Sequence, residues 1–379
     1  MPSLFLILIH LGLLCKVYSA PNRVPEDIAA QLDARAILKL PSADPFYHAP
    51  DNISMYSPGA IIRSRPPPTP LSFYGFHTNL ANSRQLLFRT NGVNGEPLAS
   101  VTTVLIPHNA NFSNLLSYQV EIDSPWEGCF PSITLQQPGA NVASISSQYG
   151  QLWFISALAR GWVVAVPDFE GPNAAFGCGI LGGQATLDGL RAVLQSESIT
   201  GVSPNARTVI WGYSGGAQAT EFALELQPDY APELNITAAA IGGAPANFRN
   251  ILPKINKSIG SGISPAAISG LARAYPGVQK VLDEKLLPQK KADFQKVQGQ
   301  CLVPTVVQFA FQDIFSYFDG GEKVLDDPAV LQAMNESIMG QRNVPTVPTY
   351  LYHAINDELL PMEDIENLYD HYCDGGANI

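Results

Sequence analysis

From residue 115 onward, short apolar runs of strand length alternate with longer segments of helical pattern. The candidate strands fall at residues 116–120, 162–166, 208–211, 238–241 and 349–353. Helical patterns lie between them, for example at residues 146–160 and 185–195. Because strands that alternate with helices pair through crossover connections, the pattern predicts an α/β protein whose mostly parallel sheet is flanked by helices on both faces.

The chain before residue 115 has a different pattern. Residues 85–90 and 99–107 have strand composition, and Asn-Gly pairs lie between them. This arrangement predicts a hairpin that joins the sheet. Residues 21–70 are rich in Pro, Asp and Ser, which indicates an N-terminal arm that wraps the domain rather than a core unit. The first part of the core, with this arm, is therefore expected to span residues 21–245.

Residues 246–341 interrupt the alternation of strands and helices. Helical patterns at residues 265–275 and 278–287 occur there with scattered Gly and Pro. About a hundred residues between adjacent core strands is far more than an ordinary connection, so the segment is expected to be an inserted helical cap, or lid. The second part of the core would be residues 342–379. A cap over the carboxyl edge of the sheet would shape a pocket for an apolar acyl chain.

Several features indicate export. Residues 4–14 are almost continuously apolar and are followed by Ser19 and Ala20, which predicts a signal peptide over residues 1–20. No later segment has the length of a membrane span. Sequons that could carry N-linked glycans occur at Asn52, Asn111, Asn235, Asn256 and Asn335. We therefore expect a secreted, extracellular glycoprotein.

Charge and motif content exclude several functions. The chain has 22 basic and 33 acidic residues, a net charge of −11, and no basic patch interleaved with aromatic residues. Nucleic acid is therefore not an expected partner. The Asp, Glu and His residues show neither HExxH nor CxxC spacing, so no metal and no organic cofactor is expected.

The most informative motif is the pentapeptide Gly-Tyr-Ser-Gly-Gly at residues 212–216. It follows the apolar run at 208–211 and precedes a segment of small residues, which predicts a strand, a sharp turn and a helix. A serine at such a turn is a nucleophile elbow, as in the α/β-hydrolase fold. Ser214 is therefore the expected nucleophile, and the amide of Gly215 is the expected oxyanion donor. Asp123, in a loop after an early strand, is the candidate for the second donor.

The remaining triad members are less clearly marked. Asp357 follows the strand at 349–353 and is the expected acid, with its neighbour Glu358 as the alternative. His371 is the only histidine after Asp357, and it lies in a helical pattern at 364–372. A histidine base is expected on a loop after one more strand. We therefore favour a C-terminally truncated chain that lacks its base, with His371 on a helix surface.

Several stretches together resemble the fungal secretory lipases of the lipase-A type, within the α/β-hydrolase superfamily. They are residues 99–107, 117–132, 166–172, 187–192, 211–216, 242–247 and 369–377. The resemblance implies Ser214 as nucleophile, Asp357 as acid, oxyanion donors at Asp123 and Gly215, and a lid between about residues 246 and 313. It also implies a disulfide between Cys129 and Cys301. In such enzymes, a cysteine at the position of Cys373 pairs with a later cysteine. In this chain Cys373 would therefore stay unpaired unless it forms a disulfide with Cys178. Asp168 and Glu170 are interpreted as loop anchors.

The expected function is a secreted carboxylic-ester hydrolase, most simply a triacylglycerol lipase, which works through an acyl-enzyme on Ser214. Its partners would be a lipid or small ester substrate and, transiently, a lipid interface contacted by the cap, and the protein would be a monomer. Two alternatives remain open. One is an esterase for smaller acylated metabolites, and the other is a non-catalytic secreted protein of the α/β-hydrolase type.

Overall fold

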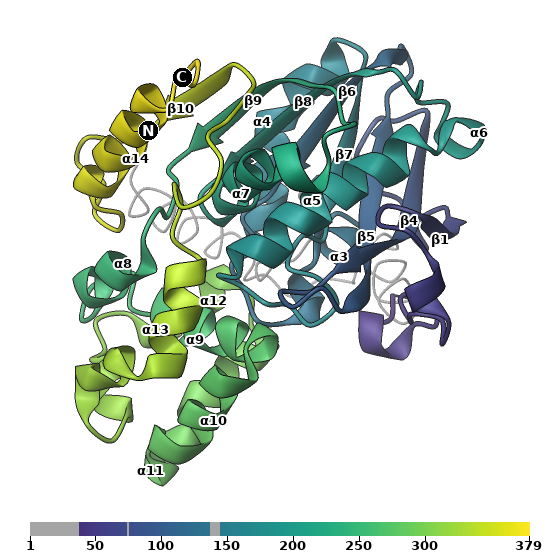
Figure 1. Ribbon diagram of the computed structural model, residues 1–379. Coiled ribbons are helices and arrows are strands. Elements are labelled where there is room, and N and C mark those ends of the chain that lie inside the picture. The colour runs from purple at the N-terminus through teal and green to yellow at the C-terminus, as the bar shows by residue number, and fades with distance from the viewer. Residues whose placement is uncertain (1–37, 74–75, 137–144) are drawn as a thin grey trace, which may run out of the picture.

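The computed structural model describes residues 38–73, 76–136 and 145–379. The expected signal peptide, residues 1–20, lies outside the described residues. The dominant element is an eight-stranded sheet with the order β1-β4-β5-β7-β6-β8-β9-β10 (Figure 1). Its strands are β1 (Ile61–Arg65), β4 (Asn82–Asn91), β5 (Pro97–Ile106), β6 (Asn111–Gln119), β7 (Trp162–Pro167), β8 (Arg207–Tyr213), β9 (Ile236–Gly242) and β10 (Thr349–Tyr352).

The sheet is parallel on one side and antiparallel on the other. Strands β7, β6, β8, β9 and β10 pair in parallel, whereas β1, β4, β5 and β7 pair antiparallel. The predicted hairpin is formed by β4 and β5. The five strands predicted from the apolar runs are all present as the parallel set, so the prediction of a mostly parallel sheet flanked by helices is confirmed.

Helices cover both faces of the sheet. Successive side chains of a strand point to opposite faces, so the apolar side chains on each face need a helix to bury them. Val163 packs in one core cluster with residues of α5 (Gly179–Leu194) and α7 (Gly215–Tyr230), whereas its neighbour Val164 packs in another with α4 (Ile145–Ala159). Helix α14 (Met362–Asp374) joins the first cluster through Ile365, Leu368 and Tyr372. Short helices α3 (Pro131–Thr134) and α6 (Glu197–Thr200) and the 3₁₀ turn η3 (Glu127–Cys129) complete this part of the chain.

The described part of the N-terminal arm contains two 3₁₀ turns, η1 (Pro41–Ala43) and η2 (Ile53–Met55), and strand β1 at the edge of the sheet. The small strands β2 (Ser72–Phe73) and β3 (Phe76–His77) follow the arm. The composition of residues 61–65 does not predict a strand, because two arginines and a following proline run interrupt the apolar pattern. The strand forms there because β4 offers a pairing edge.

Residues 248–336 form a separate helical layer. It contains α8 (Phe248–Ile255), α9 (Ile263–Ala274), α10 (Pro276–Lys285), α11 (Pro288–Phe294), α12 (Leu302–Phe309) and α13 (Pro328–Glu336), with 3₁₀ turns η5 (Gln295–Gly299), η6 (Ile314–Tyr317) and η7 (Gly321–Asp326). These helices gather beyond one end of the sheet, at the lower left of Figure 1. They share their own apolar cluster, which includes Phe248, Leu271 and Phe309.

No helix within the described part of the chain has both the length and the apolar character that crossing a bilayer requires.

Candidate active site

Ser214 lies at a strained turn between β8 and α7. Its backbone has φ 54° and ψ −126°. This conformation is energetically unfavourable for any residue other than glycine. The Ser214 amide donates to the carbonyl of Gly242 at 2.9 Å, which ties the turn to the end of β9. A Cβ atom on Gly216 would lie 1.9 Å from the main-chain oxygen of Gln119, so only glycine lets α7 approach β6 this closely. These are the features of a nucleophile elbow.

Asp123 lies directly beside the elbow. It follows β6, has φ 47°, and is 5% exposed. A Cβ atom on Gly215 would lie 1.8 Å from Asp123 Oδ1, so the carboxyl group rests against the first residue of α7. Burial raises the pKa of Asp123 to about 7, although the nearby Ser214 side chain lowers it. Below that pH the carboxyl group is neutral and can donate a hydrogen bond.

Asp357 is held by its own loop after β10. Its Oδ1 accepts the main-chain N–H groups of Leu359 at 2.9 Å and Leu360 at 2.8 Å. Lys254 Nζ donates to its main-chain oxygen at 3.0 Å. Glu358, the alternative acid, is exposed and makes no hydrogen bond or ion pair with another described residue. Asp357 is therefore the better-ordered carboxylate, and its Oδ2 is free of main-chain donors.

Tyr213, the residue before Ser214, stacks on Tyr352 at the end of β10, with the ring centroids 6.3 Å apart. Burial, followed by the charge of Asp357, raises the pKa of Tyr213 to about 12. Asp123, Ser214 and Asp357 follow the carboxyl ends of the parallel strands β6, β8 and β10, with β9 between β8 and β10 in the sheet.

No histidine within the described ranges hydrogen-bonds to Ser214. His371 is exposed on α14 and makes no ion pair with Asp357. His353 is the histidine beside the acid: its Nε2 lies 4.0 Å from Asp357 Oδ2, and its side chain is only 1% exposed. Burial lowers the pKa of His353, so the ring is neutral around pH 7.

Three further buried carboxyl groups surround the elbow. The two oxygens of Asp168 accept the Ser132 amide at 2.9 Å and the Ser132 hydroxyl at 2.5 Å, so this side chain anchors α3. Glu170 lies two residues further on, in the turn after β7. Glu121, two residues before Asp123, was missed by the sequence reasoning. Its position directly after a buried strand could have indicated a role near the site, because functional residues often lie in the loops that follow such strands.

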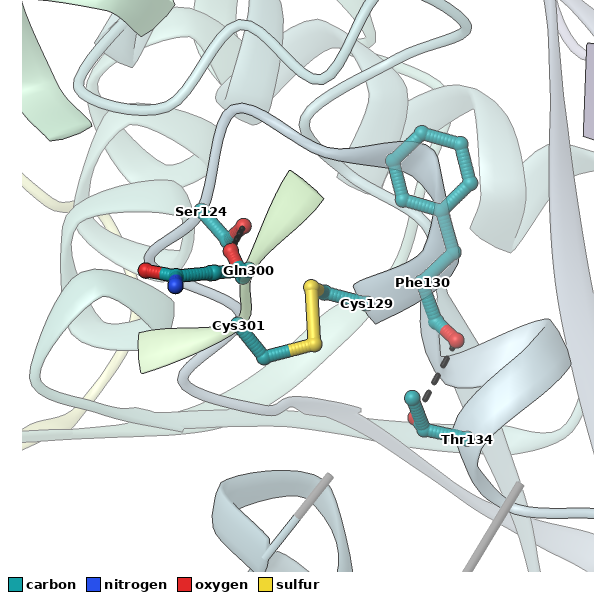
Figure 2. Close-up of a disulfide and its surroundings, with 6 residues drawn as sticks. All are labelled: Ser124, Cys129, Phe130, Thr134, Gln300 and Cys301. Atoms are coloured by element: carbon teal, nitrogen blue, oxygen red, sulfur yellow. Dashed lines mark hydrogen bonds between the residues drawn. A yellow bond between two sulfur atoms is a disulfide. The ribbon is translucent and has the colours of Figure 1, made fainter. Parts of the chain in front are cut away.

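A disulfide joins the loop after Asp123 to the helical layer. Cys129 and Cys301 are 172 residues apart in sequence, and this is the pair that the resemblance implies. Beside it, the Ser124 hydroxyl donates to the Gln300 carbonyl at 2.7 Å (Figure 2). Cys178 is buried and free, and Cys373 is exposed and free, so these two do not pair with each other.

The sequon asparagines differ in accessibility. Asn52, Asn111, Asn235 and Asn335 are exposed. Asn256 is half-buried, and its amide is engaged at both atoms: Nδ2 donates to Asp313 at 2.9 Å and Oδ1 accepts from the Ile314 amide at 2.8 Å. A glycan on Asn256 would therefore compete with contacts that hold the layer together. Within the described ranges, no cluster of His, Cys, Asp or Glu could hold a metal ion.

The buried carboxyl groups predict a protein that is more stable in acid than at neutral pH. Burial raises the pKa of Glu121 to about 8 and those of Asp123 and Asp168 to about 7. The native state then keeps protons that the unfolded chain has lost above about pH 4, so the free energy of unfolding falls as pH rises toward 8. His353 gives the opposite slope, because burial lowers its pKa, but it is a single group, whereas several buried carboxyl groups titrate the other way.

We expect the urea concentration at the unfolding midpoint to decrease as the pH is raised from about 5 to about 8 at constant ionic strength. The free energy of unfolding should fall by at least about 2 kcal/mol over this range. Asp168→Asn removes one of the titrating groups and should flatten the slope. An equal or higher midpoint at the higher pH would contradict the assignment of these groups as buried neutral acids.

Comparison with known proteins agrees with this geometry. A family model described as secretory lipase matches residues 136–379. The chain is 41% identical to Lipase A of Arthroderma benhamiae over 345 residues, which are 89% of this chain and 73% of that protein. It is 37% identical to a trichothecene C-3 esterase of Fusarium sporotrichioides, over 89% of this chain and 77% of the esterase.

A solved structure gives the same result for the fold. The closed state of Candida antarctica lipase A superposes with a TM-score of 0.81 at 31% sequence identity, and the match covers 90% of this chain and 80% of that one. The predicted α/β-hydrolase fold is thereby confirmed.

Proposed function

This chain belongs to the secretory lipase family and is an ester hydrolase of the lipase type, and from that premise we propose that Ser214 is its nucleophile. Asp123 and Gly215 would supply the oxyanion donors and Asp357 the triad acid. The observation that carries this assignment is the position of the Ser214 turn: it has a positive φ and stands between the Asp123 carboxyl and the first turn of α7.

The reaction would proceed through an acyl-enzyme. The Ser214 oxygen attacks the ester carbonyl, and the carbonyl oxygen becomes negatively charged. The Gly215 amide, as the first of α7, has no acceptor within the helix and can donate to that oxygen. The Asp123 carboxyl, while neutral, supplies an O–H donor beside it. Collapse of this intermediate would break the ester C–O bond and release the alcohol, which takes up the proton that a base removed from Ser214. Water would then cleave the bond between the acyl group and Ser214, releasing the acid and restoring the hydroxyl.

A base must take the Ser214 proton. Asp357 is arranged to orient an imidazole, because its Oδ1 is occupied by two main-chain N–H groups and its Oδ2 remains available. Neither His353 nor His371 hydrogen-bonds to Ser214 in the described structure. The alternative of a non-catalytic protein therefore stays a second candidate, and it differs from the first in whether Ser214 reacts at all.

The substrate would be an ester with an apolar acyl chain. A small cavity beside Gly215 is lined by Phe169 and Phe176, and the helical layer beyond it has an apolar core. We infer a triacylglycerol lipase. The likeness to a trichothecene C-3 esterase keeps an esterase for smaller acylated metabolites as the alternative.

The same proposal assigns the rest of the chain. Residues 1–20 would be a signal peptide, residues 21–245 and 342–379 the hydrolase core, and residues 246–341 a lid that contacts a lipid surface transiently. The protein would act outside the cell as a monomer.

Hydrolysis of a chain-length series tests this function. We expect p-nitrophenyl palmitate and emulsified triolein to be cleaved with a higher kcat/KM than p-nitrophenyl acetate, because a longer acyl chain buries about 0.8 kcal/mol more per methylene group. A fluorophosphonate probe should label one serine, identified as Ser214 by peptide mapping. Preference for acetate would favour the esterase, whereas a folded protein without labelling or hydrolysis would favour the non-catalytic alternative.

A further inference from the structure

Glu170 is a buried carboxyl group without an evident structural partner. It is 2% exposed, and neither carboxyl oxygen makes a hydrogen bond of good geometry. The polar groups that approach it are the main-chain N–H groups of Ser124 and Asp123. Burying a carboxyl group with weak partners is costly, so its position calls for an explanation. Its neighbour Asp168 differs, because both its oxygens are bonded to Ser132.

The position of Glu170 relates it to the nucleophile. One small cavity is lined by Glu170 together with Gly215 and Gln218 of α7. Asp123, whose amide approaches Glu170, presses its carboxyl group against Gly215 from the other direction. The Asp123–Ser124 segment is therefore approached by Glu170 at its main-chain N–H groups and is tied to the Gln300 carbonyl through the Ser124 hydroxyl. Asp123 needs such support because its φ of 47° is unfavourable for a non-glycine residue.

We propose that Glu170 is a positioning residue for oxyanion stabilisation: its carboxyl group holds the Asp123–Ser124 main chain from behind, so that the Asp123 carboxyl stays against Gly215 and Ser214. This inference rests on the proposed function of Ser214. Glu170 does not touch the substrate in this account and acts only through Asp123.

The protonation of Glu170 determines how the proposal is tested. Burial, followed by the charge of Asp123, raises the pKa of Glu170 well above its ordinary value. The charged or titratable groups that face it or its partner are Asp123, Asp168, Glu121 and Arg273. Arg273 makes no ion pair with Glu170 in the described structure, and its Nη1 donates to the Asn173 carbonyl at 2.9 Å. Its carboxyl group therefore keeps its proton to a higher pH than an exposed glutamate does, and glutamine is a close mimic of the shape and polarity of this protonated form.

The test compares Glu170→Ala with Glu170→Gln in the full chain. The rate of Ser214 labelling by a fluorophosphonate probe is resolved into the maximal rate constant and the probe concentration at half-saturation. We expect Glu170→Ala to lower the maximal rate constant about 10- to 100-fold, since full removal of an oxyanion donor costs about 100- to 1,000-fold. The half-saturating concentration should change little. Glu170→Gln should stay within about threefold of the unmodified protein, because its amide keeps an acceptor and a donor.

Asp168→Ala is the matched control. It removes an equally buried carboxyl group from the same turn, but one that holds α3 rather than the Asp123 loop. Its labelling rate per folded molecule should match that of the unmodified protein. If Glu170→Ala labels normally, if Glu170→Gln loses as much as Glu170→Ala, or if Asp168→Ala loses as much as either, the proposal is overturned.

Amide hydrogen exchange separates this proposal from the proposed function. Glu170→Ala should accelerate exchange in residues 120–126, whereas Asp168→Ala should accelerate it in residues 130–136. If the unmodified protein is not labelled, the proposed function of Ser214 fails. The exchange pattern then still decides whether Glu170 holds the loop, and unchanged exchange in residues 120–126 overturns that part directly.

Discussion

Replacing Ser214 with alanine is expected to abolish labelling by a fluorophosphonate and to reduce ester hydrolysis by about 10⁴- to 10⁶-fold, to the background rate. The reason is that no other group at the turn can form the acyl-enzyme bond. Donors at Asp123 and Gly215 would remain and could polarise a bound ester, which leaves a small residual rate. The measurement is initial-rate hydrolysis of p-nitrophenyl esters together with quantitative labelling.

A second serine provides the matched control for this variant. Ser264 is the second residue of α9 in the helical layer, and its hydroxyl is buried without a hydrogen-bond partner. Ser264→Ala removes the same atom from an interior position away from the turn, so hydrolysis and labelling should be unchanged. Full labelling of the Ser214→Ala variant would show that another residue is the nucleophile.

Removal of the Cys129–Cys301 disulfide should have the largest effect on stability. Replacing both cysteines with alanine is expected to lower the free energy of unfolding by about 2–5 kcal/mol, because the bond closes a loop of 172 residues and so restricts the unfolded chain. The expected loss is at the upper end of that range for a long loop. Urea unfolding with a shared m-value measures it.

The free cysteines supply the controls. Cys373→Ser changes an exposed thiol and should leave the urea midpoint within about 0.5 kcal/mol of the unmodified protein. A reducing agent should destabilise the unmodified protein but not the double alanine variant. If the double alanine variant unfolds at the same urea midpoint as the unmodified protein, the disulfide does not stabilise the folded state relative to the unfolded chain, and the prediction is contradicted.

The sequence predicts the elbow and the sheet well because both depend on local patterns. A serine between an apolar run and small residues has one common structural interpretation. The need for glycine at 215 and 216 comes instead from close contacts with Asp123 and with the main chain of Gln119, which only the folded structure shows.

For the proposed triad acid, the residues alone leave Asp357 and its neighbour Glu358 as candidates, and the family resemblance favours Asp357. In the structure only Asp357 of the two accepts main-chain hydrogen bonds, from Leu359 and Leu360.

Buried acids could not be predicted from the sequence. Glu221 and Glu225 lie four residues apart on α7, a spacing that usually indicates a solvated helix face. In the structure both are fully buried beneath α14, where the Tyr372 hydroxyl donates to both. Burial and the Glu225 charge raise the pKa of Glu221 well above its ordinary value. Such a pair is created by packing between elements 150 residues apart, which no local pattern encodes.

Asp123 and Ser214 both keep a positive φ, and Asp123 rests its carboxyl group against the first residue of the helix that follows Ser214. Each such residue costs roughly 1–3 kcal/mol relative to a relaxed backbone, a cost that glycine would largely avoid. In the proposed mechanism, ester cleavage requires the side chains at positions 123 and 214 despite this cost. A chain in which neither side chain took part in catalysis would be expected to gain stability from glycine at these two positions.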